Sequence, residues 1–421
     1  MTSQSDTLSP PPTSLSVIFA QREAERAAKR AHTQHDHFEI ACVAASVIIM
    51  AYSSLFSIVP ILVFYGLWLP RVLHKGVAIL LPPRRSSLGI LLPLLACFSA
   101  FWSGYRGITL HHGVELLSML LCVIVIARHV DAEHFAKGVC IGATLSLLAS
   151  LASRRYGFDS FSGTYSLIGL FGSKNQVGFM AEIGIVATLA LLPSVRGIIP
   201  VTLFCVIPFA VYLVSLYLCK SATAVLSLAL TVAVISCVYA VTRFTKQSRL
   251  PIIGISVIAI AAVVLAALNL DLEDTVLHKF GKDTTLTGRT YLWQEGTRIG
   301  MEHPVLGHGY TAFWVQGQKQ AERYWFEFGI PSKSGFHFHN LFVQTFVDLG
   351  ALGCLLMALL LLSACRKSLR NTLQKGLTTE CILALGIAFM FLARAFVEVD
   401  LLGPFGIGLL MFFYPLFRPA R

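Results

Sequence analysis

Charged side chains are scarce in this sequence of 421 residues, because Asp, Glu, Lys and Arg together make up only 13% of it. A soluble domain carries about 25%. Hydrophobic residues make up 55%, the mean hydropathy is +0.71, and the apolar side chains fall in runs long enough to cross a bilayer, about 17–25 residues each. This composition excludes an ordinary soluble domain. It predicts an all-α, polytopic membrane protein, because helices satisfy their own backbone polar groups in lipid.

Signatures of several other protein classes are missing. The sequence contains no Walker A motif, no Rossmann glycine fingerprint and no H-E-x-x-H motif. The ten Cys residues lie in or beside apolar runs and form no CxxC pair, and the segment 271–338 has none, so we expect no structural disulfides. Residues 1–37 lack the apolar core and cleavage site of a signal peptide, and the first span is therefore expected to act as an uncleaved signal.

The apolar runs predict about twelve transmembrane helices. Their expected bounds are 40–57, 58–73, 88–102, 108–127, 135–152, 175–192, 198–218, 222–242, 251–270, 340–363, 378–397 and 402–418. The predicted organisation is a cytoplasmic N-terminal tail (1–37), transmembrane helices 1–9 (38–270), a large extracytoplasmic or periplasmic loop (271–338) and transmembrane helices 10–12 (339–418).

The distribution of basic residues predicts the orientation. With the N-terminus inside, 20 of the 33 Lys and Arg residues fall in inner segments, seven in the long outer loop and six in the short outer segments. Short loops decide topology under the positive-inside rule, so both termini are expected in the cytoplasm. The net charge of +11 follows largely from this topology, and we expect no nucleic-acid partner.

The loop 271–338 is much longer than the other connections and is rich in aromatic residues. It carries seven Lys or Arg and eight Asp or Glu residues, so it is close to neutral. Loops this long are usually functional or disordered, and aromatic side chains favour the membrane interface. We therefore expect a folded cap on the outer leaflet, with a short helix over 288–302 and a turn at "HPVLGHGY", where Pro304, Gly307 and Gly309 interrupt any helix.

Two stretches in this region form a signature. "TGRTYLWQEGTRIGMEHPVLGHGY" is followed by "HFHNLFVQTFVDLGALG", in which His339-Asn340, nine residues, Gly350, two residues and Gly353 form the pattern H-N-x9-G-x-x-G. These stretches resemble the O-antigen ligase and Wzy-type polymerase superfamily. The segments "FWSGYRGITLHHGVELL", "GLFGSKNQVG", "LCKSATAVLSL" and "RAFVEVDLLGPF" resemble its exopolysaccharide-polymerase (ExoQ-type) branch. One departure is Lys220, where many ligases have Arg.

The resemblance implies a metal-independent glycosyltransferase of the bacterial inner membrane, with a GT-C-like fold and no cofactor. A glycan on undecaprenyl diphosphate would give its reducing-end sugar to an acceptor hydroxyl on the outer face of the membrane. In a polymerase the acceptor is another lipid-linked repeat unit, and in a ligase it is lipid A core or a related anchor. The segments "SKNQVG" and "KSATA" favour a polymerase. A flippase and a chain-length regulator are the partners that this pathway implies.

A transporter or flippase is the third alternative for this chain. Transporters place polar groups near the bilayer midplane, often between internal repeats. Here the candidate polar groups gather at the outer ends of the predicted spans, which disfavours transport.

His339 is the predicted catalytic base. The reaction needs a proton acceptor near the acceptor hydroxyl, and an imidazole can accept a proton at neutral pH. At about 100° per residue, Gly350 and Gly353 fall on the same helix face as His339, and small residues allow a neighbouring helix to approach. The signature therefore predicts a base at the start of a tightly packed helix. The alternative is an interfacial or capping histidine.

Arg289 is the predicted catalytic cation. Its planar guanidinium can hold two phosphate oxygens, and it follows Gly288 as in the "GR" of the superfamily. The alternative is a salt bridge with Glu295 or Glu302. The remaining candidates for binding the diphosphate or the substrate are Lys220, Lys174, Asn175, Asn340, Arg394 and His337.

The pair Arg394 and Glu398 allows two further interpretations. Their i,i+4 spacing predicts that they neutralise each other. Glu398 and Asp400 also form an E-x-D sequence of a kind that binds metal in other membrane glycosyltransferases, but such motifs usually lie in the first outer loop. We therefore predict no metal site.

Overall fold

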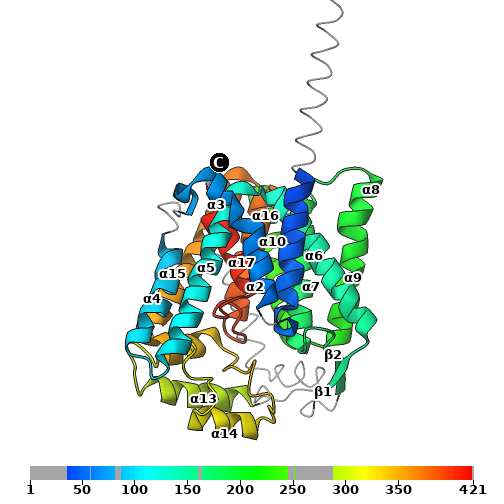
Figure 1. Cartoon of the computed structure of the whole chain (residues 1–421). Helices are drawn as coiled ribbons and strands as arrows, with labels where there is room; N and C mark the ends of the chain where they lie inside the picture. Colours follow the sequence, from blue (N-terminus) through cyan, green and yellow to red (C-terminus); the bar gives the residue numbers. More distant parts are fainter. Residues whose placement is uncertain are drawn as a thin grey trace, which may run out of the picture.

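A computed structural model of the chain describes residues 36–56, 58–80, 87–159, 164–244, 251 and 288–419. These residues form a bundle of long helices that carries two short helices across one end (Figure 1). The helices are residues 36–51, α2 (Val59–Trp68), α3 (Pro70–Lys75), α4 (Leu88–Phe98), α5 (Arg106–His129), α6 (Ala132–Ser153), α7 (Lys174–Leu191), α8 (Ile198–Val201), α9 (Ile207–Cys219), α10 (Ala222–Thr242), α13 (Arg289–Gly300), α14 (Lys319–Glu327), α15 (Leu341–Lys375), α16 (Thr379–Arg394) and α17 (Ile407–Phe417).

Helices occupy the predicted apolar runs that fall within the described residues, whereas the run 251–270 lies outside them except for Pro251. Within the described residues, five helical segments are long and apolar enough to cross a membrane, namely α5, α6, the continuous stretch Ile198–Cys219, α10 and α15. The chain is thus a helical membrane protein, and the number of twelve crossings stays a prediction. The predicted span 58–73 is divided into α2 and α3, because Pro70 begins a new helix after Leu69.

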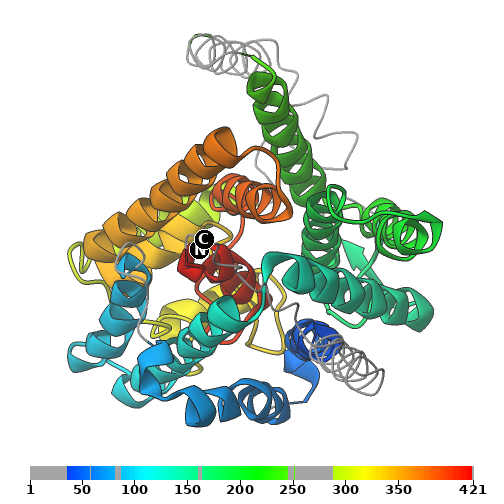
Figure 2. The same cartoon turned by 90° about the horizontal axis from the view of Figure 1, so that it is seen from above.

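The core of the bundle lies around α7 and α17, whose apolar side chains are buried on nearly all sides. Viewed from above, α17 (red) lies near the centre with the other helices around it (Figure 2). A helix that is apolar all round lies either in lipid or inside the protein, and the burial of α17 places it inside. The ring of Tyr414 in α17 stacks on that of Phe135 in α6, with centroids 3.6 Å apart. This interior fixes the ends of the helices that carry the site.

A small hairpin departs from the all-α prediction. Strands β1 (Tyr156–Asp159) and β2 (Thr164–Leu167) pair in antiparallel register, with Tyr156 opposite Leu167. Alternating aromatic and small polar residues favour a pleated edge over another helical turn. The hairpin lies at the same end of the bundle as α13 and α14 (Figure 1).

Helices α13 and α14, with the turns between them, form the cap. The predicted helix over 288–302 is observed as α13, and the "HPVLGHGY" segment is a series of turns, as predicted. The cap has its own small core of buried side chains, from Leu292, Ile299, Phe313, Ala321, Tyr324, Trp325, Phe338 and Val347. The last of these belongs to α15, so the cap is packed on the beginning of that helix.

The prediction of one unbroken helix after His339 is wrong. Asn340 is the N-cap of α15, and His339 precedes it with a positive φ of 50°. Gly350 interrupts the helix with φ 66° and ψ −164°, a region that is essentially restricted to Gly. The helical-wheel relation between His339, Gly350 and Gly353 therefore does not hold.

The break at Gly350 allows the "HPVLGHGY" turn to dock on α15. The backbone N–H groups of His308 and Gly309 donate to the carbonyls of Val347 and Asp348, both at 2.9 Å. In return, the N–H of Ala351 donates to Pro304 O at 2.8 Å and that of Leu352 to Val305 O at 3.2 Å. A Cβ on Gly350 would lie 2.3 Å from the backbone of Val305. The glycine is thus required by the docking of the cap and not by a helix–helix contact.

Candidate functional site

A cavity of about 880 Å³ lies between the cap and the helix bundle. Its walls come from the first turns of α5, the start of α7, the cap turns, the start of α15 and the segment after α16. The lining residues discussed below are His112, Asn175, Thr311, Trp314, Lys333, Phe336, His337, His339, Gln344, Asp348, Arg394, Glu398 and Asp400.

His339 reaches this cavity because Asn340 ends the preceding loop. The Asn340 side-chain oxygen accepts hydrogen bonds from the N–H groups of Phe342 and Val343, at 2.9 and 3.1 Å, which is the bonding of a helix N-cap. Its amide nitrogen donates to Phe396 O at 3.0 Å and ties α15 to the segment after α16. Asn340 therefore positions the histidine before it.

Glu398 joins the predicted residues into one cluster. Its Oε1 accepts hydrogen bonds from Arg289 Nη2 at 2.9 Å and from Asn175 Nδ2 at 2.8 Å. Its Oε2 lies 3.5 Å from His339 Nδ1, a charge contact longer than an ordinary hydrogen bond. Burial opposes ionisation of Glu398, but its contacts with His339 and Arg289 outweigh this effect and hold the pKa of this carboxyl below its usual value. This arrangement leaves Nε2 of His339 as the nitrogen that can take a proton.

His337 supports the backbone of His339. Its Nδ1 accepts a hydrogen bond from the His339 N–H at 3.0 Å, so the proton of the neutral ring is on Nε2. Burial lowers the pKa of His337 to about 3, and His339 and Arg289 add to this effect. His337 therefore stays uncharged at neutral pH.

Arg289 is buried behind Glu398 and is not part of the cavity lining. Its Nη1 donates to Val397 O at 2.8 Å, while Nη2 donates to Glu398. The alternative of a salt bridge with Glu295 or Glu302 is wrong, because these two carboxylates pair with Arg298. In this structure Arg289 holds the Glu398 segment in place.

Asn175 connects the cluster to α10. Ser173 caps α7 and so fixes Asn175 in the first helical turn. The Asn175 Oδ1 accepts a hydrogen bond from Ser221 Oγ at 3.0 Å, and its Nδ2 donates to Glu398. Hydrogen bonds thus run from Ser221 through Asn175 to Glu398, whose other oxygen faces His339 at 3.5 Å.

The two predicted lysines do not line the cavity. Lys220 has a positive φ of 49° between α9 and α10, and its side chain is exposed. Lys174 is the first residue of α7 and is half-buried. Their assignment to a diphosphate stays a prediction.

Arg394 lines the cavity but does not pair with Glu398 as predicted. Its Nε and Nη2 donate to the two oxygens of Asp400, at 2.6 and 3.2 Å, and its Nη1 lies 3.2 Å from Glu182 Oε2. The turn after α16 separates Arg394 from Glu398, whose carboxylate faces Arg289 and Asn175 instead. The i,i+4 rule fails here because α16 ends at Arg394.

The buried charges of the cluster are not predominantly positive. The guanidiniums of Arg289 and Arg394 face three carboxylates, from Glu182, Glu398 and Asp400. When every group is ionised, the carboxylates exceed the guanidiniums by one charge. Burial raises the pKa of Asp400 against the opposing effect of Arg394, and a proton there or on His339 would make the cluster neutral.

Side chains that the sequence prediction did not include also line the cavity. Gln344 Oε1 accepts a hydrogen bond from Trp314 Nε1, and Gln344 Nε2 donates to Asp348 Oδ2, both at 3.1 Å. Lys333 pairs with Glu322 at 2.6 Å. Of these residues, Asp348 could have been identified from the sequence, because a carboxylate inside an apolar run is a functional candidate in a membrane protein.

The described residues contain two groups with the composition of a metal site. The ligand atoms of His337, His339 and Glu398 lie within 4.8 Å of one another. Glu398 thus groups with the histidines, whereas Asp400, the other carboxylate of the E-x-D sequence, pairs with Arg394. Imidazole and carboxylate ligands suit Zn²⁺ and related ions.

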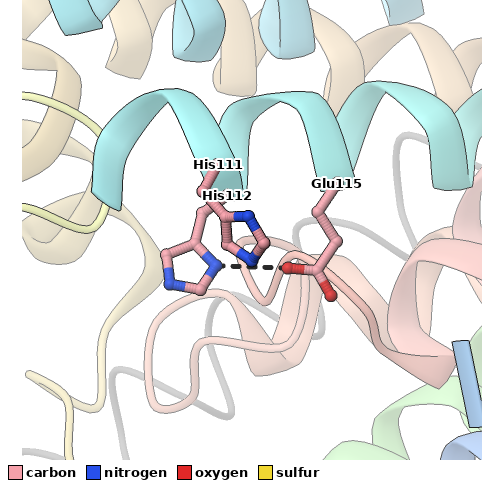
Figure 3. Close-up of side chains that lie close together, drawn as sticks. All are labelled: His111, His112 and Glu115. Atoms are coloured by element: carbon pink, nitrogen blue, oxygen red, sulfur yellow. Dashed lines mark hydrogen bonds and ion pairs between the residues drawn. The ribbon is translucent and has the colours of Figure 1, made fainter. Parts of the chain in front are cut away.

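The second group lies on α5, at the cavity margin. His111, His112 and Glu115 place their ligand atoms within 4.8 Å of one another, and their side chains point to the same side of the helix (Figure 3). His112 Nδ1 lies 3.2 Å from Glu115 Oε2, within hydrogen-bond distance, so a direct contact already satisfies two of the three. The prediction of a metal-independent protein remains to be tested.

Comparison with known proteins places this site in a family. Residues 207–358 match the family model described as O-antigen ligase, a region that contains Arg289, His339 and Gly350. The chain belongs to the O-antigen ligase and Wzy-type polymerase superfamily and, within it, to the ExoQ-like branch that its motifs predict. Over 389 residues it is 37% identical to the exopolysaccharide production protein ExoQ of Rhizobium meliloti (strain 1021), a match that covers 90% of this chain and 87% of that protein.

Proposed function

We propose that this protein is a polysaccharide polymerase that joins undecaprenyl-diphosphate-linked repeat units on the outer face of the inner membrane. The observation that carries the proposal is the contact of His339 with Glu398 at the wall of an 880 Å³ cavity beneath the cap. The family supports polysaccharide synthesis. The cavity supports a substrate larger than a single sugar, because ligand pockets for small molecules are about 300–1,000 Å³ and this one is near the upper limit.

The proposed reaction is a displacement at the anomeric carbon of the donor glycan. The acceptor hydroxyl oxygen forms the new glycosidic bond, its proton passes to Nε2 of His339, and the bond to the diphosphate breaks. Glu398, opposite Nδ1, orients the imidazole and stabilises the imidazolium that forms, as carboxylates do in other histidine bases. Undecaprenyl diphosphate leaves as the anion.

Positive charge near the leaving group is the second requirement, because charge develops there in the transition state. Arg394 lies in the cavity wall, and Arg289 lies behind Glu398. Lys174 is the first residue of α7, and Lys220 follows the end of α9. We propose that Arg394, Lys174 and Lys220 attract the diphosphate and that Arg289 acts mainly by holding Glu398.

A ligase is the second candidate, because the same residues would serve a different acceptor. The identity with ExoQ over most of both chains favours the polymerase. Deletion of the gene in its host separates the two candidates: loss of a polymerase leaves single repeat units, whereas loss of a ligase leaves long lipid-linked chains. A flippase and a chain-length regulator are proposed partners of either enzyme.

Turnover of purified protein with defined lipid-linked repeat units tests the proposal. His339→Ala should reduce chain growth at least about 100-fold, since a general base contributes 10²–10⁴-fold. Arg289→Ala should have a similar effect, because it releases Glu398 from its position beside His339. The matched controls His303→Ala and Arg298→Ala alter exposed residues of the cap and should grow chains normally. Near-normal polymer from His339→Ala would remove this residue from the mechanism.

The same assay with EDTA tests metal independence. We expect turnover to persist in the chelator. If turnover instead requires a divalent ion, the ion concentration needed for half-maximal turnover in Glu398→Gln and Glu115→Gln would identify the group that binds it.

A further inference from the structure

The cavity has two differently built walls. The wall described above consists of charged groups that are already paired. The other wall consists of Trp314, Phe336, Gln344, Asp348 and Thr311. These side chains come from the cap and from the first two turns of α15, and the proposed reaction assigns them no role.

The second wall is held rigid by hydrogen bonds. Gln344 Oε1 accepts from Trp314 Nε1 at 3.1 Å and from the Phe338 N–H at 3.3 Å, and Gln344 Nε2 donates to Asp348 Oδ2 at 3.1 Å. The Trp314 ring packs edge-on against Phe336, with centroids 5.1 Å apart. Because both ends of the Gln344 amide are occupied, the indole and the carboxylate are fixed relative to each other.

Two buried polar atoms on this wall lack partners within the described part of the chain. They are Asp348 Oδ1 and Thr311 Oγ1. Asp348 is 2% exposed, and its carboxylate already receives the Gln344 amide and the backbone N–H of Thr311. Its Oδ1 is therefore the acceptor that a further donor would satisfy. A ligand that fills this wall should therefore bring hydroxyl donors.

The chemistry of the wall selects among ligands. Asp348 has no guanidinium beside it, and Lys333, the cap's cation in the cavity lining, is already paired with Glu322 at 2.6 Å. This wall is therefore unsuited to the diphosphate. An aromatic face offers contact to the C–H side of a sugar ring, while the carboxylate and the threonine hydroxyl bond to its hydroxyl groups. A neutral pyranose meets all three requirements.

We propose that Trp314, Gln344, Asp348 and Thr311 form a sugar subsite that binds a neutral pyranose of the glycan substrate. The subsite rests on the proposed function, because it deepens the polymerase assignment by separating a sugar-binding wall from the wall that receives the diphosphate. Asp348 and Thr311 are specificity-determining residues here, and His339 remains the base.

Saccharide binding tests the subsite without requiring turnover. The probes are neutral oligosaccharides released from the host exopolysaccharide by partial acid hydrolysis, titrated into the full-length protein in nanodiscs while tryptophan fluorescence is recorded. The wild type should give a saturable change that Trp314→Phe abolishes. Trp102→Phe is the matched control, since this indole donates to Leu306 O outside the cavity lining, and it should retain the change.

The polar groups are tested by Asp348→Asn and Thr311→Val. Each should weaken saccharide binding about tenfold, the effect of one lost hydrogen bond to a buried group, and should raise the KM for the lipid-linked repeat more than it lowers kcat. Thr311→Val keeps the inference testable if Asp348→Asn fails to fold. Inorganic pyrophosphate should not displace the saccharide.

Competition by pyrophosphate, normal saccharide affinity in both polar variants, or no fluorescence change in the wild type would each overturn the subsite. His339→Ala should bind saccharide normally while losing chain growth, which distinguishes the two proposals. If the wild type binds saccharide through these residues but makes no polymer, the subsite stands and the polymerase assignment fails.

Discussion

Each oxygen of the Glu398 carboxylate has its own partners. Oε1 is held by Arg289 and Asn175, and Oε2 is left to face His339. The imidazole itself is only partly enclosed, with 24% of its side chain exposed. Asn175 of α7 and Arg289 of α13 thus hold the Glu398 carboxylate in place beside the proposed base. A change at Glu398 should therefore affect the chemical step more than substrate binding.

We predict that Glu398→Gln lowers kcat about 100-fold and leaves KM nearly unchanged, because the amide fills the same space but cannot stabilise an imidazolium. Glu302→Gln is the matched control, since its carboxylate is exposed and belongs to the cap. The variant must keep the thermal stability of the wild type for this comparison. A kcat within threefold of the wild type would contradict the positioning role.

His337 gives a prediction of pH-dependent stability. Burial lowers its pKa to about 3, with His339 and Arg289 adding to the shift and Glu398 opposing it. The unfolded chain takes up a proton near pH 6.5 that the folded chain rejects, so the stabilisation is complete above that pH and is lost as the pH falls towards 3. Linkage gives a loss of about 1.5 kcal/mol between pH 6.5 and pH 5.

The variant His337→Asn should reduce this dependence, because an amide does not titrate and its oxygen can still accept the His339 N–H. The melting temperature in detergent, measured between pH 7 and pH 5, should fall less steeply in the variant than in the wild type. Parallel curves for the two proteins would assign the pH dependence to other groups.

At the scale of the elements, the break in α15 couples the cap to the bundle. Residues on both sides of Gly350 exchange backbone hydrogen bonds with the turn at Pro304–Gly309. This turn lies between α13, which carries Arg289, and α14. The glycine therefore affects the position of the whole cap through its backbone conformation alone.

Gly350→Ala should destabilise the protein more than the same change at Gly376. Gly350 lies at the break of α15 and Gly376 is its C-cap. Their backbone angles are similar, with φ 66° and ψ −164° at Gly350 and φ 79° and ψ −169° at Gly376. An alanine at either position therefore costs about 1–3 kcal/mol of backbone strain. Only at Gly350 would the new Cβ meet backbone, at 2.3 Å from Val305, whereas nothing lies within 4 Å at Gly376. Overpacking adds about 1–3 kcal/mol there.

Thermal unfolding of both variants in the same detergent measures this difference. Equal losses for the two glycines would mean that close approach of the cap turn is not what position 350 requires.

The sequence predicted the membrane class, the family and the cap helix, because hydropathy, a family motif and turn residues are local signals. It failed where a local rule assumed a continuous helix. The helical-wheel argument placed His339 and Gly353 on one helix face, but α15 is broken at Gly350. The i,i+4 argument paired Arg394 with Glu398, but α16 ends at Arg394. The contacts among Trp314, Gln344 and Asp348 in the proposed sugar subsite were missed, because these residues meet only after the cap folds back on α15.

At the scale of the whole molecule, the cap and the C-terminus lie at opposite ends of the bundle (Figure 1). If the bundle spans the membrane, the cavity and the C-terminus therefore open to opposite compartments. The basic residues give the direction: 20 of 33 lie in the segments predicted inside and six in the short segments predicted outside.

We predict that alkaline phosphatase is active when it is fused after residue 330 in the cap and inactive when it is fused to the C-terminus, with green fluorescent protein giving the reverse pattern. The phosphatase needs disulfides, which form only on the oxidising side of the membrane. An active phosphatase at the C-terminus would place the cavity in the cytoplasm. There a lipid-linked glycan that has already crossed the membrane could not reach His339, so this one result would exclude polymerisation on the outer face even if every residue of the site were correctly assigned.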